Sequence, residues 1–124
     1  MLLVKTYLAE SKIHGIGCYA AERILKGTTV WVFDGRIDTL YNEQQLSKLS
    51  LPCQEQIRKY AYFDYFYNSF VLCGDDSRFF NHSINPNCLD PNPHIVVAAR
   101  DIEIGEEITS DYSTFTSTID PNLT

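Results

Sequence analysis

The sequence has no pair of cysteines close enough together to begin a zinc knuckle. Its four cysteines are spread along the chain, at Cys18, Cys53, Cys73 and Cys88. Structural zinc sites of that type take their ligands from closely spaced Cys pairs. The histidines are scattered as well, at His14, His82 and His94. We therefore expect no metal site.

Long hydrophobic runs are also missing. No stretch approaches the roughly 20 apolar residues that a helix needs to cross a membrane. The N-terminal segment, residues 1–12, is too short and too soon charged for a signal peptide. The expected protein is neither secreted nor membrane-bound, and it lies in the cytoplasm or nucleus with its thiols reduced.

Basic residues are few relative to acidic ones. The chain has 10 Lys and Arg against 16 Asp and Glu, a net charge of −6. Binding to a nucleic-acid backbone requires clustered Lys and Arg, so direct contact with nucleic acid is not expected. An acidic surface favours a basic partner such as a Lys-rich peptide, although an acidic soluble protein without such a partner has the same composition.

What the sequence does have is one domain's length and many aromatic residues. Its 124 residues are 44% hydrophobic and include seven Phe, eight Tyr and one Trp. Tyrosines often line a cleft that is apolar but needs polar tips, and aromatic strands favour the same residues. The patterns predict short strands and a hairpin, at residues 5–9, 28–33, 95–99 and 60–72. Between the strands, Asn42 and Pro52 indicate the starts of two short helices.

Two glycines one residue apart, Gly15 and Gly17, form the first stretch that indicates a ligand. Such a turn lets the backbone approach a ligand closely, with its N–H groups pointing outward. A tight turn without a ligand is the alternative. A dinucleotide-binding fingerprint is excluded, because no third glycine and no crossover helix follow.

The second stretch, RFFNHSINPNC at residues 78–88, places amide and hydroxyl side chains directly behind two phenylalanines. Asn and Ser compete with backbone hydrogen bonding, so this stretch is not expected to be ordinary strand. It is suited to presenting polar groups to a pocket, although an Asx-turn followed by a proline turn has the same composition. The third stretch, GEEITSDY at residues 105–112, is predicted to bury Ile108 and to leave Glu106 and Glu107 in solvent. Its last residue, Tyr112, is expected to aim its hydroxyl into a cleft, with a core or edge tyrosine as the alternative.

In this order and spacing, the three stretches resemble the motifs of the SET-domain protein-lysine N-methyltransferases. The resemblance covers nearly the whole chain. It implies a mostly-β fold, the β-clip, with several small sheets, short helices and a C-terminal pseudoknot. It also implies a single domain over residues 1–124, with a short helical insert at 38–59 and a tail at 113–124 that lacks the zinc-binding Cys-rich segment of many relatives. Such a minimal core is similar to the stand-alone SET proteins of viruses and bacteria.

The resemblance implies methyl transfer from S-adenosylmethionine to a lysine amine in a protein substrate such as a histone. The residues that it assigns to cofactor binding are Ile16, Gly17, Arg78, Asn81, His82 and Tyr112. Tyr112 is also the expected catalytic residue, because a neutral phenol can both donate and accept a hydrogen bond and so orient the amine. Tyr65 is the second expected catalytic residue, with Tyr62 and Tyr67 as competitors. No general base is evident, and water is expected to carry the proton away.

Two departures from the family pattern affect the expected site. Ser110 stands where relatives often carry Phe or Tyr, which leaves room for multiple methylation. The tail has no cysteine, so Phe115, a second copy of the chain or another partner is expected to complete the lysine channel. The missing tail also favours an alternative, a catalytically inactive SET fold that binds peptide or cofactor. A plain β-rich scaffold is a third interpretation.

Overall fold

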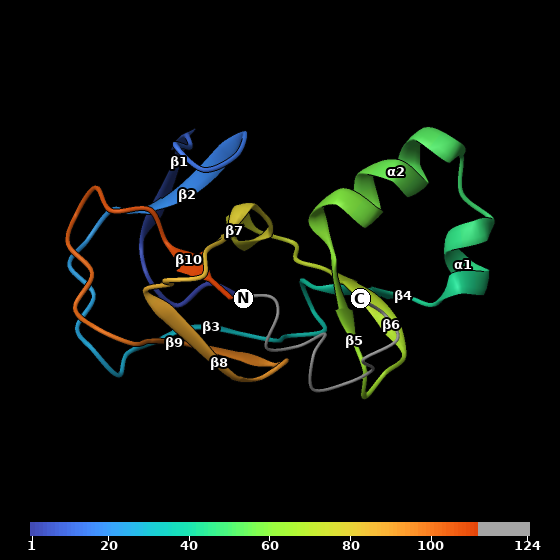
Figure 1. Cartoon of the computed structure of the whole chain (residues 1–124). Helices are drawn as coiled ribbons and strands as arrows, with labels where there is room; N and C mark the ends of the chain where they lie inside the picture. Colours follow the sequence, from blue (N-terminus) through green and yellow to red (C-terminus); the bar gives the residue numbers. More distant parts are fainter. Residues whose placement is uncertain (112–124) are drawn as a thin grey trace.

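The computed structural model describes residues 1–111, in which the strands form four small sheets (Figure 1). The antiparallel sheets are β1–β2 (Thr6–Glu10, Ile16–Ala20), β3–β9–β8 (Thr29–Val32, Ile95–Ala98, Cys88–Asn92) and β4–β6–β5 (Thr39–Tyr41, Ser69–Leu72, Tyr62–Asp64). The fourth sheet pairs β7 (Asn81–His82) in parallel with β10 (Thr109–Ser110). The predicted mostly-β fold of several small sheets is confirmed.

Two short helices, α1 (Glu43–Ser47) and α2 (Leu51–Tyr60), follow β4. Asn42 caps α1 as predicted, because its side chain accepts a hydrogen bond from the Gln45 backbone N–H at 2.8 Å. Ser50 caps α2, and Pro52 lies in the first turn of that helix. Both helices lie beside the β4–β6–β5 sheet, on the side of the molecule away from β1 and β2 (Figure 1).

One cluster of buried apolar side chains joins β2, β3, β8 and β9. It includes Ile24, Ile102 and Ile108, which are 2%, 0% and 0% exposed. The predicted inward packing of Ile108 is therefore confirmed. Burying a side chain of this size stabilises the fold by roughly 1.5–3 kcal/mol, so the segment before β10 is held firmly against the core.

Asn87 fastens the late part of the chain to the loop behind β7. Its Nδ2 donates to the Glu107 carbonyl at 2.8 Å, and its Oδ1 accepts from the Thr109 N–H at 2.9 Å. Asn87 is 3% exposed, so these bonds are shielded from water. They bring β10 beside β7, as the expected crossing of the two segments requires.

Three strands differ from the sequence expectation, and one of them, β4, lies inside the segment 38–59 that was expected to be a helical insert. Asn81 and His82 were expected to be irregular, yet they form β7, because β10 supplies a parallel partner for their backbone. β8 was not predicted at all, because its second half, DPN, contains residues that disfavour strands. β8 lies at the edge of its sheet, where a proline without an N–H is tolerated.

Candidate functional site

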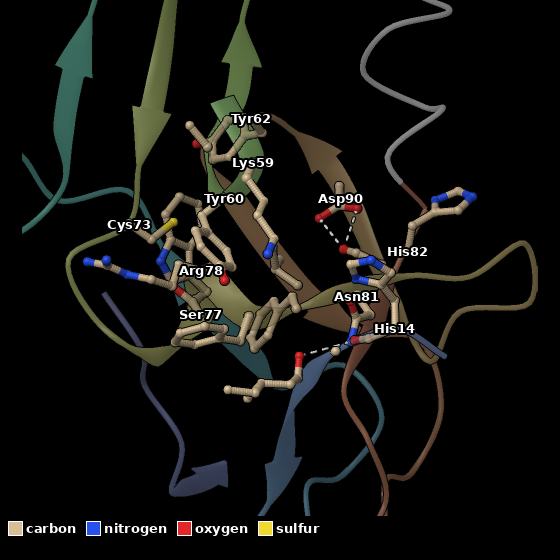
Figure 2. A pocket seen from close by; sticks show the side chains of 18 of the residues that line it. His14, Lys59, Tyr60, Tyr62, Cys73, Ser77, Arg78, Asn81, His82 and Asp90 are labelled. Atoms are coloured by element: carbon tan, nitrogen blue, oxygen red, sulfur yellow. Dashed lines mark hydrogen bonds between the residues drawn. The ribbon is translucent and has the colours of Figure 1, made fainter. Parts of the chain in front are cut away.

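A cavity of about 370 Å³ opens where the three sequence stretches meet (Figure 2). Its wall comes from the turn before β2, the junction of α2 and β5, and the 3₁₀ turn Asp76–Phe79 that leads into β7. Side chains of β3, β8, β9 and β10 complete the wall. The volume lies within the roughly 300–1,000 Å³ typical of small-molecule sites, which makes this cavity the candidate site.

Some of the predicted site residues line this cavity and some do not. Those in its wall are Ile16, Arg78, Asn81 and His82. Gly17 and Tyr65 are not among the lining residues in the described part of the chain, and Tyr112 lies outside that part. Tyr62, the competitor of Tyr65, does line the cavity. The Tyr65 ring is in edge contact with Phe63, at 6.0 Å between centroids, and its catalytic role stays a prediction.

Glu107 links the glycine turn to the Asn-His segment, which corrects the expectation that this side chain is only solvated. Its carboxylate accepts hydrogen bonds from Ser11 Oγ at 2.7 and 2.9 Å and from Asn81 Nδ2 at 2.8 Å. A Cβ at Gly17 would stand 2.5 Å from Glu107 Oε2. Any side chain at position 17 would therefore displace the carboxylate from this place, a role of Gly17 that the sequence pattern alone did not indicate.

The Asn81 amide holds the glycine turn in place. Besides its bond to Glu107, Asn81 Nδ2 donates to the carbonyl oxygens of His14 at 3.0 Å and Ile16 at 3.2 Å. An amide nitrogen carries two hydrogens, so these contacts occupy its donor capacity. The Asn81 amide nitrogen thus holds the backbone of the glycine turn at the edge of the cavity.

An aromatic wall, formed by Trp31 and Tyr62, lines another part of the cavity. The Trp31 and Tyr62 rings meet edge to face, with centroids 6.1 Å apart, and the Tyr62 hydroxyl donates to the Pro93 carbonyl at 2.7 Å. Burial raises the pKa of Tyr62, so its hydroxyl stays protonated. Trp31 is 3% exposed, and its Nε1 has no hydrogen-bond partner among residues 1–111. Buried N–H groups are normally paired, so the Trp31 Nε1 is a buried donor left over beside the cavity.

The aromatic end of the cavity also contains an acid that the sequence pattern did not single out. Asp90 and Ser110 both line the cavity, and Ser110 Oγ donates to the Asp90 carboxylate at 3.1 and 2.9 Å. Burial raises the pKa of Asp90 to about 6, the Ser110 hydrogen bond opposes that shift, and the nearby charge of Asp111 adds to it. Asp90 is therefore more basic than an ordinary carboxylate.

A lysine and a thiol also line the cavity. Lys59, the penultimate residue of α2, extends into the cavity (Figure 2) with its Nζ 5.2 Å from the centroid of the Tyr60 ring. Burial raises the pKa of the Cys73 thiol to about 12, so Cys73 is protonated at neutral pH and is not an activated nucleophile.

Residues 1–111 contain no group of three or more His, Cys, Asp or Glu side chains that could hold a metal ion. The helices of the same part of the chain are all too short or too polar to cross a membrane.

Comparison with known proteins finds one family, because residues 15–113 match the model of the SET domain. Human histone-lysine N-methyltransferase 2D is 33% identical over 117 residues, which cover 86% of this chain and 2% of that protein. The Drosophila melanogaster histone-lysine N-methyltransferase trr is 33% identical over 113 residues, which cover 86% of this chain and 5% of that protein. This chain thus spans 2 to 5% of the length of these curated relatives.

Solved structures share the fold. A candidate histone methyltransferase of Plasmodium falciparum superposes with a TM-score of 0.62 and 21% identity, over 90% of this chain and 95% of that chain. A humanized mutant of the Chaetomium thermophilum Polycomb Repressive Complex 2, bound to an inhibitor, gives a TM-score of 0.64 and 23% identity, over 91% of this chain and 15% of that chain. At these identities the likeness establishes the fold alone.

Proposed function

Because this chain belongs to the SET-domain family, we propose that it transfers methyl groups from S-adenosylmethionine to lysine side chains of a protein substrate. Lysine methyl transfer is the activity in the names of its curated relatives. The observation that carries the proposal is the convergence of three separate sequence stretches on one cavity, represented by Ile16, Asn81 and Ser110.

The residues around the cavity suit a ligand that is partly polar and partly apolar. The apolar side is formed by the Trp31 and Tyr62 rings, which line the cavity. The carbonyl oxygens of His14 and Ile16 are fixed at the cavity edge by the Asn81 amide. We assign cofactor binding to Ile16, Arg78, Asn81 and His82, with Tyr112 as a further member. Gly17 contributes indirectly, by admitting Glu107.

When bound, the sulfonium of S-adenosylmethionine would supply an electrophilic methyl group to a neutral amine. A free lysine amine has a pKa of about 10.4 and is protonated at neutral pH. The aromatic wall formed by Trp31 and Tyr62 would lower that pKa, because desolvation disfavours the ammonium form. We propose that Tyr112 orients the amine, with Tyr65 or Tyr62 as the second channel tyrosine.

A Lys-rich protein such as a histone is the proposed substrate. The net charge of −6 favours a basic partner, and the curated relatives are named for histone lysines. We further propose that a second copy of the chain or another partner completes the lysine channel. One of the similar solved structures is itself part of a complex.

Titration calorimetry of the purified chain with S-adenosylmethionine tests the first half of this proposal. We expect saturable binding that Asn81→Ala weakens by about tenfold or more, the equivalent of roughly one to two lost hydrogen bonds. Absence of binding by the wild type would overturn the proposed function.

Transfer of a labelled methyl group to core histones and to proteins of a lysate tests the second half. Tyr112→Phe should abolish or strongly reduce transfer, whereas Tyr7→Phe, a change on β1 at a side chain that is 42% exposed, should leave it unchanged. Cofactor binding without transfer to any protein would instead support the catalytically inactive binding module.

A further inference from the structure

Asp90 is the only acid among the described residues that line the cavity. It lies on β8, where pairing with β9 is irregular between Leu89 and Asn92. Such irregularities redirect side chains away from their regular positions in a strand. The carboxylate is held by Ser110, whose Oγ donates to it at 2.9 and 3.1 Å. Asp90 is thus a fixed negative group in a cavity that is otherwise largely aromatic on this side.

The position of Asp90 in the cavity follows from that of Ser110 on β10. The register of β7 and β10 places Thr109 beside Asn81, and Ser110 one step farther along, beside His82. Figure 2 shows Asp90 on the Tyr62 side of Asn81. The carboxylate therefore lies in the cavity between Asn81 and Tyr62, which is its aromatic end.

On the basis of the function proposed above, we propose that Asp90 is the proton acceptor for the substrate amine: its carboxylate receives the ammonium of the incoming lysine and takes one proton from it. In this step an N–H bond breaks and its electron pair stays on nitrogen. An O–H bond forms on Asp90, so that an ammonium and a carboxylate become a neutral amine and a neutral acid. Burial favours the neutral pair, because both charged forms lose hydration in the cavity.

The surroundings of Asp90 support this role. Burial raises its pKa to about 6, which leaves it ionised at neutral pH but more basic than a solvated carboxylate. Asp111, which follows β10, adds negative charge, and the His82 ring on β7 lies 3.5 Å from Asp111. Among residues 1–111, Tyr62 on β5 and Cys88 on β8 have a pKa raised by burial and, to a smaller extent, by the Asp90 charge. The other titratable side chains that line the cavity are His14, Lys59, Tyr60, Cys73, Arg78 and His82.

The binding of n-butylammonium, which has the length of a lysine side chain, tests the inference without any cofactor. An NMR titration compares it with n-butanol, an uncharged molecule of similar shape. The wild type should prefer the ammonium, and Asp90→Asn should reduce that preference by about tenfold or more, as expected for a lost charge-assisted hydrogen bond. Glu55→Gln, an exposed change on α2, is the matched control.

The pH dependence of this binding identifies the group. An alkylammonium with a pKa near 10.4 stays charged between about pH 5 and 8, so any change in that range comes from the protein. Binding should be full above about pH 7 and fall as Asp90 gains its proton near pH 6. Ser110→Ala removes a hydrogen bond that lowers the pKa of Asp90 and should therefore move the fall to higher pH. Because imidazoles also titrate here, His82→Gln must keep the pH dependence and Asp90→Asn must lose it.

Equal binding of ammonium and alcohol by the wild type, or undiminished preference in Asp90→Asn, overturns the inference. If Asp90→Asn does not fold, the test is the pH midpoint of ammonium binding in Ser110→Ala. A midpoint equal to that of the wild type also overturns the inference. Titration with S-adenosylmethionine separates the two levels of proposal. If the chain binds the cofactor but shows no Asp90-dependent ammonium binding, only the role of Asp90 as proton acceptor is refuted. If the chain does not bind the cofactor, the proposed function is refuted.

Discussion

The Asp90 carboxyl is predicted to cost the folded chain stability at neutral pH. Burial raises its pKa from 3.8 to about 6, so the folded state binds this proton more tightly than the unfolded state does. The stabilising contribution is complete below the unfolded value, near pH 4, and is lost as the pH rises through about 6. A difference of about two pKa units corresponds to roughly 3 kcal/mol of unfolding free energy at pH 7.

Asp90→Asn tests this magnitude, because the amide keeps an oxygen that can accept from Ser110 and removes the charge. Urea denaturation, followed by the fluorescence of Trp31, measures the unfolding free energy at several pH values. The variant should match the wild type near pH 4 and exceed it by about 3 kcal/mol at pH 7. Glu55→Gln, in which an exposed carboxylate is replaced, should show no such growing difference.

A stability difference that is independent of pH, or one that favours the wild type at pH 7, would refute the reasoning. It would mean that burial does not penalise the Asp90 charge in the folded state. The expected gain also has a functional counterpart, since the same variant should lose ammonium binding. Destabilising groups that are retained at a site are typical of residues kept for function rather than for stability.

Two further substitutions test the contacts that assemble the cavity. Asn87→Ala should lower the unfolding free energy by about 2–5 kcal/mol in urea denaturation, because it leaves two buried backbone groups of the late segment without partners. The control, Asn85→Ala at an exposed position, should change the unfolding free energy by less than about 0.5 kcal/mol. Equal effects of the two substitutions would contradict this account. Gly17→Ala should displace the Glu107 carboxylate, lower stability by roughly 1–3 kcal/mol and weaken cofactor binding in titration calorimetry. The control is Gly35→Ala, whose new Cβ would lie 3.9 Å from its nearest atom. If Gly17→Ala has the stability and the cofactor affinity of the wild type, the Glu107 contact at this turn is not needed for either.

Much of the fold could be predicted from the sequence, because the signals are local. The cap at Asn42 and the proline in the first turn of α2 depend on residues within a few positions of each other. The strand around Trp31 follows from a run of β-branched and aromatic residues. β8 could not be predicted, because its pairing with β9 overrides a composition typical of a turn.

Only the site residues that lie within the three sequence motifs could be predicted. The order of the glycine turn, the Asn-His stretch and the late stretch sufficed to predict that Ile16 and Asn81 lie together, and both line the cavity. The part played by Glu107 was hidden, since two adjacent glutamates usually indicate a solvated surface. Its use depends on the missing side chain at Gly17, 90 residues away in the sequence, and sequence patterns do not report such long-range contacts.

Ser110 shows most clearly why residue size alone was an insufficient guide to the chemistry of this cavity. In the sequence, a serine at this position indicates only extra room beside the amine. In the structure, Ser110 is 2% exposed and its hydroxyl donates to Asp90. The small side chain therefore leaves room for a hydrogen-bonded carboxylate rather than for an empty space. A larger aromatic side chain at position 110 would remove that donor. The pair, rather than the size of either side chain, therefore determines whether the aromatic end of the cavity prefers a cation to a neutral group of the same shape.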